Sequence, residues 1–358
     1  MNRLRIARVV EQMGRIGLGQ ILVSSLESTY YLSGIWCPQG ERLQALLIKA
    51  DGEVTLVANR MFALSGQQGS AKIVEYDDIE DSVAVLAGLI SPGRIGIDKT
   101  WPSHFLIRLM ALRGDIVPAL GSEPVDFTRM QKDEAEIAAM VCSSRMNDEV
   151  VRKLRTSLRV GETELDVARR YADMALQIGA DGNSFTPLIC FGKNAAEPHH
   201  GTDGTALREG DAVILDVGLA KDHAMSDMTR TVFFGSATDE QRAVYDAVLC
   251  ANLAAKAVVR PGVLLKEIDR AARRTIEDAG YGPHFLHRTG HGIGIEVHEP
   301  PDVSAVSEVV ARPGMMFSIE PGIYLPGKFG VRIEDLVMVT EDGCLVLNEL
   351  DRELMVIK

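Results

Sequence analysis

The chain has 358 residues, of which 46% are hydrophobic and 25% charged, with a formal net charge of −12 and a pI near 5.2. Its length suits two domains, at roughly 100–200 residues each. The acidic balance and the lack of a Lys/Arg-rich run argue against a nucleic-acid or anionic-membrane surface. No apolar stretch is long enough to cross a bilayer, so we expect a cytoplasmic protein. Five scattered cysteines without a C-x-x-C spacing are typical of reduced thiols.

The first part of the chain alternates helix-like and strand-like segments, which predicts a small α/β domain. The expected strands cover residues 20–25, 45–50, 53–59 and 94–98. The expected helices run through about Met13 and over residues 81–90 and 104–113. Asp51-Gly52 between two apolar runs is a strong hairpin signal. We expect this domain to cover residues 1–127, because the character of the sequence changes after Phe127.

The second domain, expected over residues 128–358, begins with a long charged amphipathic helix at residues 131–154. The first turn of this helix is acidic, as the helix dipole favours. Further helices are expected at residues 164–180, 243–259 and 266–280. Strand pairs separate and follow these helices. The order helices, hairpin, helices, hairpin predicts an α+β fold, with helices on the outer face of antiparallel sheet and two similar halves.

Two aspartates lie on the first of these hairpins. Asp216 is set in the apolar run VILDVGL, which predicts a strand covered on both faces. Asp227 follows a polar connection and opens the strand-like run MTRTVFF. Because a buried carboxylate needs a strong partner, we expect both acids to have a charged or metal partner at this hairpin.

Two glutamates repeat this arrangement near the end of the chain. Glu320 lies in MMFSIEPGIY and Glu334 in VRIEDLVMV, and the Pro/Gly-rich turn LPGKFG joins the two runs. Any one of the four acids, taken alone, would usually be a turn or cap residue. Together they predict two hairpins that deliver four carboxylates to one place.

Four buried carboxylates raise one another's pKa and cannot all ionise without cations. With a neutral His291 in the glycine-rich segment GHGIG, their charge of minus four would be balanced by two divalent ions. Oxygen-rich ligation with one imidazole favours manganese, with cobalt, iron or zinc as alternatives. The sequence therefore predicts a site for two divalent metal ions.

Seven of the eight histidines lie between His199 and His298, which indicates a local role. His287 and His291 have the spacing of a helical zinc pair, but the glycines between and after them make a helix improbable. A phosphate cradle is also disfavoured, since the strand-turn-helix context of a dinucleotide site is missing. We expect these glycines to let the backbone pass close to metals or substrate. Arg332 alternates onto the face of Glu334, where it would either pair with a ligand carboxylate or contact a substrate carboxylate.

Several segments closely resemble signature segments of the pita-bread metallopeptidases, which include methionine aminopeptidase, aminopeptidase P and Xaa-Pro dipeptidase (prolidase). The segments are DVG, SDMTRT, HRTGHGIGIEVHEPP, SIEPGIY and VRIEDLV. The similarity extends from about Gln131 to the end. Residues 1–127, including TYYLSGIW, resemble the amino-terminal domain that prolidases and aminopeptidase P share.

This resemblance implies roles for individual residues. Asp216 would chelate one metal, Asp227 and Glu334 would bridge both, and His291 with Glu320 would hold the other. Glu320 would also shuttle a proton. Substrate contacts are implied at His199, His287, His298 and Arg332, with His199 and His298 orienting the scissile amide and stabilising the oxyanion.

The resemblance further implies a homodimeric peptidase that hydrolyses Xaa-Pro dipeptides by attack of a metal-bridging hydroxide. Alternatives are an aminopeptidase P-like enzyme on longer Xaa-Pro peptides and a metal-dependent hydrolase of a small non-peptide amide. A non-catalytic binding protein and a metal-free creatinase-like enzyme are disfavoured because all five ligands are present. His223-Ala224 and Thr202 depart from the usual Gly-Tyr and Pro of the family, which puts substrate identity in question.

Overall fold

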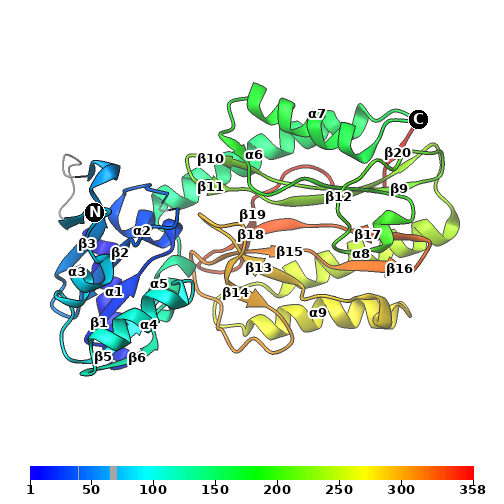
Figure 1. The fold of residues 1–358 in the computed structure, drawn as a ribbon. Coiled ribbons are helices and arrows are strands. Elements are labelled where there is room, and N and C mark those ends of the chain that lie inside the picture. The colour runs from blue at the N-terminus through cyan, green and yellow to red at the C-terminus, as the bar shows by residue number, and fades with distance from the viewer. Residues whose placement is uncertain (39, 65–70) are drawn as a thin grey trace. The chain divides into compact units, whose positions relative to one another are not determined.

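The computed structural model describes residues 1–38, 40–64 and 71–358. The chain divides into two compact units, Met1–Arg129 and Met130–Lys358, and Figure 1 labels most of their elements. Among the residues described, no helix has both the length and the apolar character needed to span a membrane.

The first unit is built on a six-stranded mixed sheet of order β4-β3-β2-β1-β5-β6. The strands are β1 Gln20–Val23, β2 Ala45–Lys49, β3 Val54–Asn59, β4 Lys72–Tyr76, β5 Gly93–Ile97 and β6 Ile116–Leu120. The helices are α1 Arg3–Arg15, α2 Leu26–Ser33, α3 Ser82–Ala87, α4 Ser103–Leu112 and α5 Glu123–Met130, with a 3₁₀ turn η1 at Arg60–Phe62. β2 and β3 form the expected hairpin, and Gly52 in its turn has a φ of 85°.

The second unit contains two larger sheets. One has the order β20-β12-β9-β8 and comprises β8 Leu188–Phe191, β9 Ala212–Val217, β12 Met228–Phe234 and β20 Val356–Ile357. The other has the order β14-β13-β15-β18-β19 and comprises β13 Gly290–Gly292, β14 Glu299–Val303, β15 Met316–Ile319, β18 Asp335–Val339 and β19 Cys344–Val346. Their pairs are antiparallel, except that β20 joins β12 in parallel.

Two smaller sheets complete this unit. The strands of the first are β7 Gly182–Asn183, β10 Leu219–Lys221 and β11 Ala224–Met225. The second pairs β16 Gly322–Leu325 with β17 Phe329–Arg332. Short 3₁₀ turns lie at η3 Asn194–Ala196 and η4 Gly282–His284.

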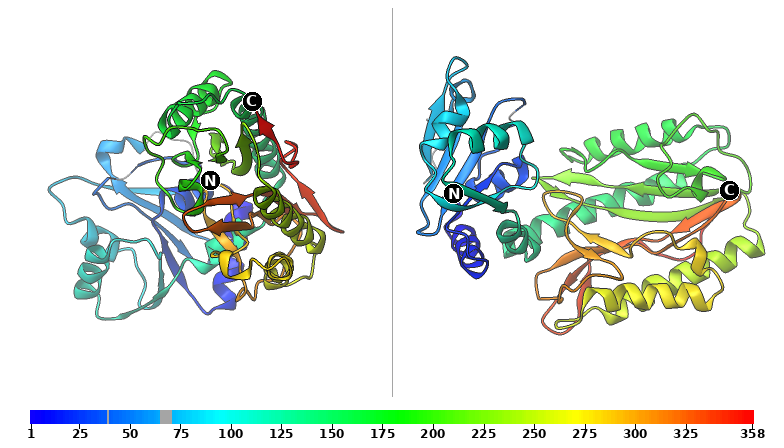
Figure 2. Two further views of the ribbon diagram at one scale, coloured as in Figure 1. Left: turned by 90° about the vertical axis from the view of Figure 1, so that its right-hand side faces the viewer. Right: turned by 60° about the horizontal axis from the view of Figure 1, so that its bottom comes forward.

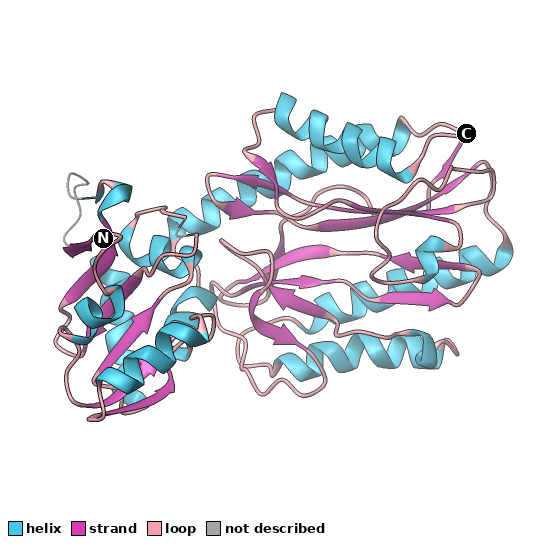
Figure 3. Ribbon diagram, viewed as in Figure 1, coloured by secondary structure: helices cyan, strands magenta, loops and turns pink. Residues whose placement is uncertain are grey.

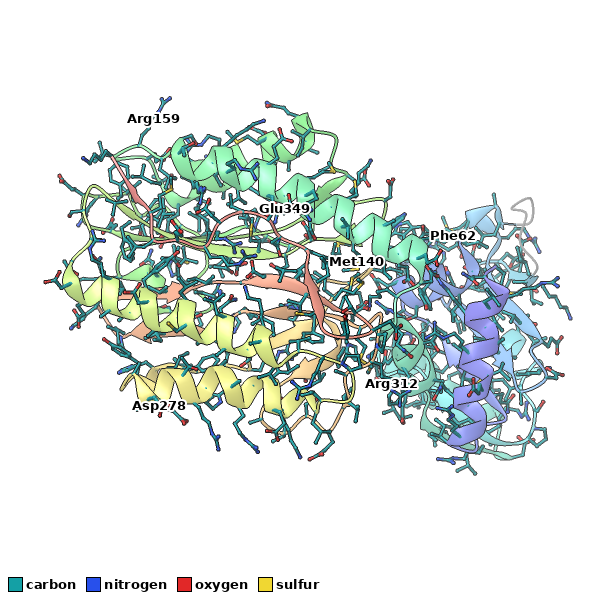
Figure 4. The ribbon with its side chains drawn as sticks, turned by 180° about the vertical axis from the view of Figure 1, so that it is seen from behind. Phe62, Met140, Arg159, Asp278, Arg312 and Glu349 are labelled. Atoms are coloured by element: carbon teal, nitrogen blue, oxygen red, sulfur yellow. The ribbon has the colours of Figure 1, made fainter. Side chains whose placement is uncertain are left out.

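Four long helices cover the outer faces of the two larger sheets (Figures 1 and 2). They are α6 Glu134–Thr156, α7 Glu164–Gln177, α8 Asp239–Val258 and α9 Leu265–Asp278. Side chains of α6 and α7 pack on the sheet that contains β9 and β12, and those of α8 and α9 pack on the sheet that contains β15 and β18. Figure 3 shows the strands between these helical layers. In Figure 4, the exposed Arg159 beyond the end of α6 extends away from the ribbon.

The strand alternation turns the acids inward, away from these helices. In β9, Val213, Leu215 and Val217 pack with α6 and α7, so Asp216 belongs to the opposite face. In β15, Phe317 and Ile319 pack with α8 and α9, which leaves the other face to Ser318. The region between the two sheets therefore receives polar side chains from both.

The structure differs from the expected hairpins in one respect. The runs 315–324 and 331–339 are each divided into two strands, and the breaks fall at Glu320-Pro321 and Ile333-Glu334. β15 pairs with β18, whereas β16 pairs with β17 in a separate sheet. Each glutamate thus lies where the chain leaves one sheet for another. At such a break the direction of the side chain is not set by the alternation of a regular strand.

Gly290 and Gly292, on either side of His291, allow close packing of protein backbone. A Cβ added at Gly290 would lie 1.8 Å from the carbonyl oxygen of Ser318, and one at Gly292 would lie 2.4 Å from that of Pro300. These glycines therefore let β13 lie tightly between β14 and β15.

We predict that Gly290→Ala destabilises the protein by about 1–3 kcal/mol or more, because the clash is with backbone that cannot rotate away. Thermal unfolding should show a midpoint lowered by several degrees. Gly343→Ala is the matched control, since the nearest atom to its Cβ, Thr340 Oγ1, is 4.0 Å away. Equal midpoints for the two variants would contradict the packing argument.

Candidate metal centre and active site

One cavity of about 530 Å³ in the second unit brings together all nine residues predicted as metal ligands or substrate contacts. Its lining includes Asp216, Asp227, Glu320, Glu334, His199, His287, His291, His298 and Arg332. Phe185, Leu188 and Val297 add apolar surface to the same lining.

The acids lie in or next to strands of both sheets. Asp216 in β9 lies opposite Thr229 in β12, and Asp227 immediately precedes β12. On the other side, the backbone N–H of Glu320 donates to Thr289 O at 2.8 Å. The backbone N–H of Glu334 donates to Thr229 O at 3.1 Å and so connects the two sheets. The four carboxylates therefore rest on hydrogen-bonded backbone.

The hydrogen bonds of His291 determine which ring nitrogen faces the acids. Its Nδ1 lies 3.1 Å from the carbonyl oxygen of Gly292, which can only accept, so Nδ1 carries the proton. Burial lowers the pKa of His291 to about 4, so the ring is neutral at neutral pH. Its Nε2 lone pair therefore faces Glu320 Oε1 at 3.3 Å and Asp227 Oδ2 at 3.6 Å. Three electron-rich atoms that face one another need a proton or a metal ion between them.

The carboxylates also retain oxygens without partners. Asp216 Oδ1, Asp227 Oδ1 and Glu334 Oε1 are buried and accept no hydrogen bond from the residues described. Burial, and then the charges of Glu334 and Asp216, raise the pKa of Asp227 well above its ordinary value. Burial and the charges of Glu320 and Asp216 do the same to the pKa of Glu334. Buried carboxylate oxygens that lack a hydrogen-bond partner are suited to bind metal ions.

This donor set fits divalent cations. Ligand atoms of Asp227, His291 and Glu334 lie within 4.8 Å of one another, and all three side chains are buried. Asp216 and Glu320 add carboxylates from either side. Oxygen ligands with one imidazole suit manganese, iron or cobalt, and also zinc.

Arg332 is held entirely by protein groups. Its guanidinium donates to Asp216 Oδ2 at 2.5 Å, to Tyr324 OH at 2.7 Å and to Thr229 Oγ1 at 3.2 Å. Thr229 Oγ1 in turn donates to Glu334 Oε2 at 2.8 Å. These contacts favour an ion pair that orients the carboxylates over direct contact with substrate.

His287 also uses both ring nitrogens within the protein. Tyr324 OH accepts a hydrogen bond from Arg332, so its own hydrogen is donated to His287 Nε2 at 2.9 Å. His287 Nδ1 then donates to Arg288 O at 2.8 Å. Both ring nitrogens of His287 are therefore occupied, so a substrate would contact only the carbon edge of its ring.

His199 and His298 differ from the other pocket histidines because both are exposed. The ring of His298 contacts that of His291 edge to face, with centroids 4.2 Å apart. Burial, followed by the proximity of His291, lowers the pKa of His298. Both histidines are thus accessible to a ligand that enters beside the acids.

A buried ion cluster holds Glu334 from behind. Asp335 accepts from Arg230, Lys256 and Arg352, and Arg230 also donates to the carbonyl of Glu334. Although burial alone would raise the pKa of Asp335, these cations hold it below its ordinary value. Their charge stabilises the backbone at Glu334.

A second group of possible metal ligands lies outside the cavity lining. It consists of Glu164, His200 and Asp203. Both oxygens of Glu164 already accept hydrogen bonds, from Phe191 N, Asn194 Nδ2 and Asp203 N. This group therefore lacks the unpartnered oxygens of the main site.

Some supporting residues were not predicted from the sequence. Tyr324 and Thr229 lie within predicted strands, where only their alternation could have indicated an inward direction. His223 lies in the turn of the β10–β11 hairpin and Ala224 begins β11, so this pair, where we expected the pocket to change, is outside the described cavity lining. Thr202 links the loop that carries His199 to β8, because its Oγ1 accepts a hydrogen bond from Ile189 N at 2.9 Å.

Two helix-covered sheets around a pocket of four carboxylates and one imidazole define a metallopeptidase of the pita-bread class. Comparisons with known proteins give the family. Residues 138–341 match the description "Metallopeptidase family M24", and residues 5–130 match the "Creatinase/Prolidase N-terminal domain". The chain belongs to metallopeptidase family M24 and is a metallo-exopeptidase.

Similar proteins include a probable dipeptidase, prolidases and an X-Pro aminopeptidase. The chain is 35% identical over 363 residues to "Probable dipeptidase PepE" of Mycobacterium tuberculosis, which covers 99% of this chain and 96% of that protein. A solved prolidase from Thermococcus sibiricus has a TM-score of 0.94 and 33% identity, covering 100% of both chains. A dipeptidase from Pyrococcus horikoshii OT3 has a TM-score of 0.93 and 34% identity, covering 99% of this chain and 100% of that one.

We predict opposite effects of Asp227→Asn on the metal-free and metal-loaded protein. The folded-state pKa of Asp227 is raised, so the stability that its protonated form contributes is lost as pH rises through that folded pKa. Removing the charge should raise the unfolding midpoint in chelator at neutral pH by about 2–4 °C per kcal/mol regained. The stabilisation by added Mn²⁺ should shrink, because a ligand oxygen is lost.

Asp173→Asn, at an exposed position on α7, is the control and should change neither midpoint. A lower midpoint of Asp227→Asn in chelator, together with an undiminished response to Mn²⁺, would show that repulsion among these carboxylates does not destabilise the metal-free protein.

Proposed function

We propose that this chain is a dinuclear metal-dependent dipeptidase that hydrolyses Xaa-Pro dipeptides. The observation that carries the proposal is the buried group of unpartnered carboxylate oxygens facing His291 Nε2 in a cavity that two exposed histidines also line. The names of the relatives, dipeptidase and prolidase, agree with this substrate class.

Five residues would hold the metals. Asp216 would bind one ion, and His291 with Glu320 the other, while Asp227 and Glu334 would bridge them. When bound, the two ions would lower the pKa of a water molecule and polarise the scissile carbonyl. Manganese is the metal we propose, given the oxygen-rich donor set.

The side chains around this centre would provide proton transfer and orientation. Glu320 is suited to carry a proton from the attacking water to the leaving nitrogen, because burial raises its pKa toward the working pH. His199 and His298 would donate to the substrate amide and to the developing oxyanion. The apolar Phe185, Leu188 and Val297 would surround the proline ring.

Arg288 supports a dipeptide in preference to a longer peptide. It lines the cavity and forms an ion pair with the exposed Asp302, so a free substrate carboxylate could take the place of that partner. A longer peptide has no carboxylate at this position. Residence in the cytoplasm and assembly as a homodimer stay predictions.

We predict that the wild type, loaded with Mn²⁺ or Co²⁺, releases proline from Xaa-Pro dipeptides faster than it cleaves longer Xaa-Pro peptides. Glu334→Ala should bind fewer than two ions per chain and lose at least about 100-fold in kcat/KM, because the bridging carboxylate is gone. Elemental analysis and proline release measure the two effects. Near-normal turnover of the metal-loaded variant would exclude the bridging role, and preference for longer peptides would favour the aminopeptidase P alternative.

We predict that Arg288→Gln raises KM for dipeptides by about tenfold with little change in kcat, because an interaction common to ground and transition states is lost. Cleavage of Xaa-Pro tripeptides should be unaffected. Arg312→Gln, outside the cavity lining, is the control. An equal loss on dipeptides and tripeptides would show that Arg288 does not read the carboxylate.

A further inference from the structure

The buried carboxylate of Glu164 lies in the first turn of α7, outside the cavity lining. It is fully buried and accepts from four groups. Oε1 accepts from Phe191 N at 2.8 Å and Asn194 Nδ2 at 2.9 Å. Oε2 accepts from Asp203 N at 3.0 Å and His200 Nε2 at 3.2 Å. A fully buried carboxylate with four hydrogen-bond donors holds the segment that carries these donors in place.

All four donors belong to one segment, residues 191–203, which also carries His199. Donors lie before and after His199 in the chain, so Glu164 holds both ends of the loop. The backbone adds two further links, from Glu164 N to Thr205 O and from Leu165 N to Asp203 O, each 3.1 Å long. The loop is thereby joined to the start of α7.

His199 depends on this backbone for its position. Its ring makes no hydrogen bond to any residue that the structure describes, although Pro198 and His199 both line the cavity. An exposed ring without its own partner is placed by the loop beneath it. A shift of about 1 Å at such a group can cost on the order of 100-fold in rate.

The contacts require a hydrogen-bond acceptor at both side-chain oxygens of residue 164. Each of its oxygens faces a backbone N–H, that of Phe191 on one side and that of Asp203 on the other. In Glu164→Gln, the amide NH₂ would face one of these N–H groups whichever way it is turned. One buried donor is then left without an acceptor, so the isosteric change breaks an anchor.

We propose that Glu164 is a positioning residue that holds the His199 loop in its active geometry and acts only through His199. This inference rests on the proposed function, in which His199 contacts the substrate. The chain offers a matched control in Glu162, whose carboxylate pairs with Arg170 and accepts from Arg159 N, with no link from its side chain to residues 191–203.

A double-mutant cycle measures whether Glu164 acts through His199. Glu164→Gln should lower kcat/KM on an Ala-Pro dipeptide by about 10- to 100-fold, mostly in kcat. In a His199→Ala background the same change should cost less than about twofold, because the group that it positions is gone. Glu162→Gln should have little effect in either background. Equal losses from Glu164→Gln in both backgrounds would overturn the proposal.

Hydrogen exchange provides a readout that needs no activity. Amides in residues 188–207 should exchange faster in Glu164→Gln than in the wild type or in Glu162→Gln. Unchanged exchange would overturn the positioning role. If the wild type cleaves no Xaa-Pro peptide, the proposed function fails while the exchange result still decides whether Glu164 holds the loop.

His200→Ala is a milder variant in case Glu164→Gln does not fold. It removes one of the four contacts and should shift both readouts in the same direction by a smaller amount. No change in either readout would count against the proposal.

Discussion

The structure of the second unit depends on the crowding of negative charge between its two sheets. Asp227 and Glu334 are buried with unpartnered oxygens, and the only described guanidinium in the cavity's buried interior, that of Arg332, is committed to Asp216, Tyr324 and Thr229. One buried cation cannot balance four carboxylates, and a neutral His291 contributes a lone pair without charge. Divalent cations resolve both problems together, because they neutralise the oxygens and accept the imidazole nitrogen.

The fold concentrates these groups by a simple device. In β9 and β15, alternate apolar side chains face a helical layer, which leaves Asp216 and Ser318 on the faces turned toward the other sheet. Breaks in the strands at Glu320 and Glu334 then free these side chains to converge. Behind them, Asp335 and its three cations stabilise the backbone without adding negative charge to the site.

Sequence reasoning recovered the fold class and nine of the residues that line the cavity, because local patterns and family-like segments mark them. Asp216 and Glu320 are conspicuous as acids within apolar runs, and the alternation around them shows which way they point. Sequence reasoning did not predict the parallel pairing of β20 or the division of the long runs into two strands each. It also missed the hydrogen bonds that link Arg332 through Thr229 to Glu334. Each of these features depends on contacts between distant segments. Glu164 reads locally as an ordinary acid in the first turn of a helix, and only the fold shows that its donors lie at residues 191–203. The ligand roles and the domain boundary at residue 127 stay predictions.

The most direct measurement of the central claim is anomalous diffraction from crystals of the Mn²⁺-loaded protein. This account predicts two anomalous peaks per chain, both among Asp216, Asp227, His291, Glu320 and Glu334, with Asp227 and Glu334 touching both. A map with no peak at these residues, or with its only peak beside Glu164, His200 and Asp203, would contradict it.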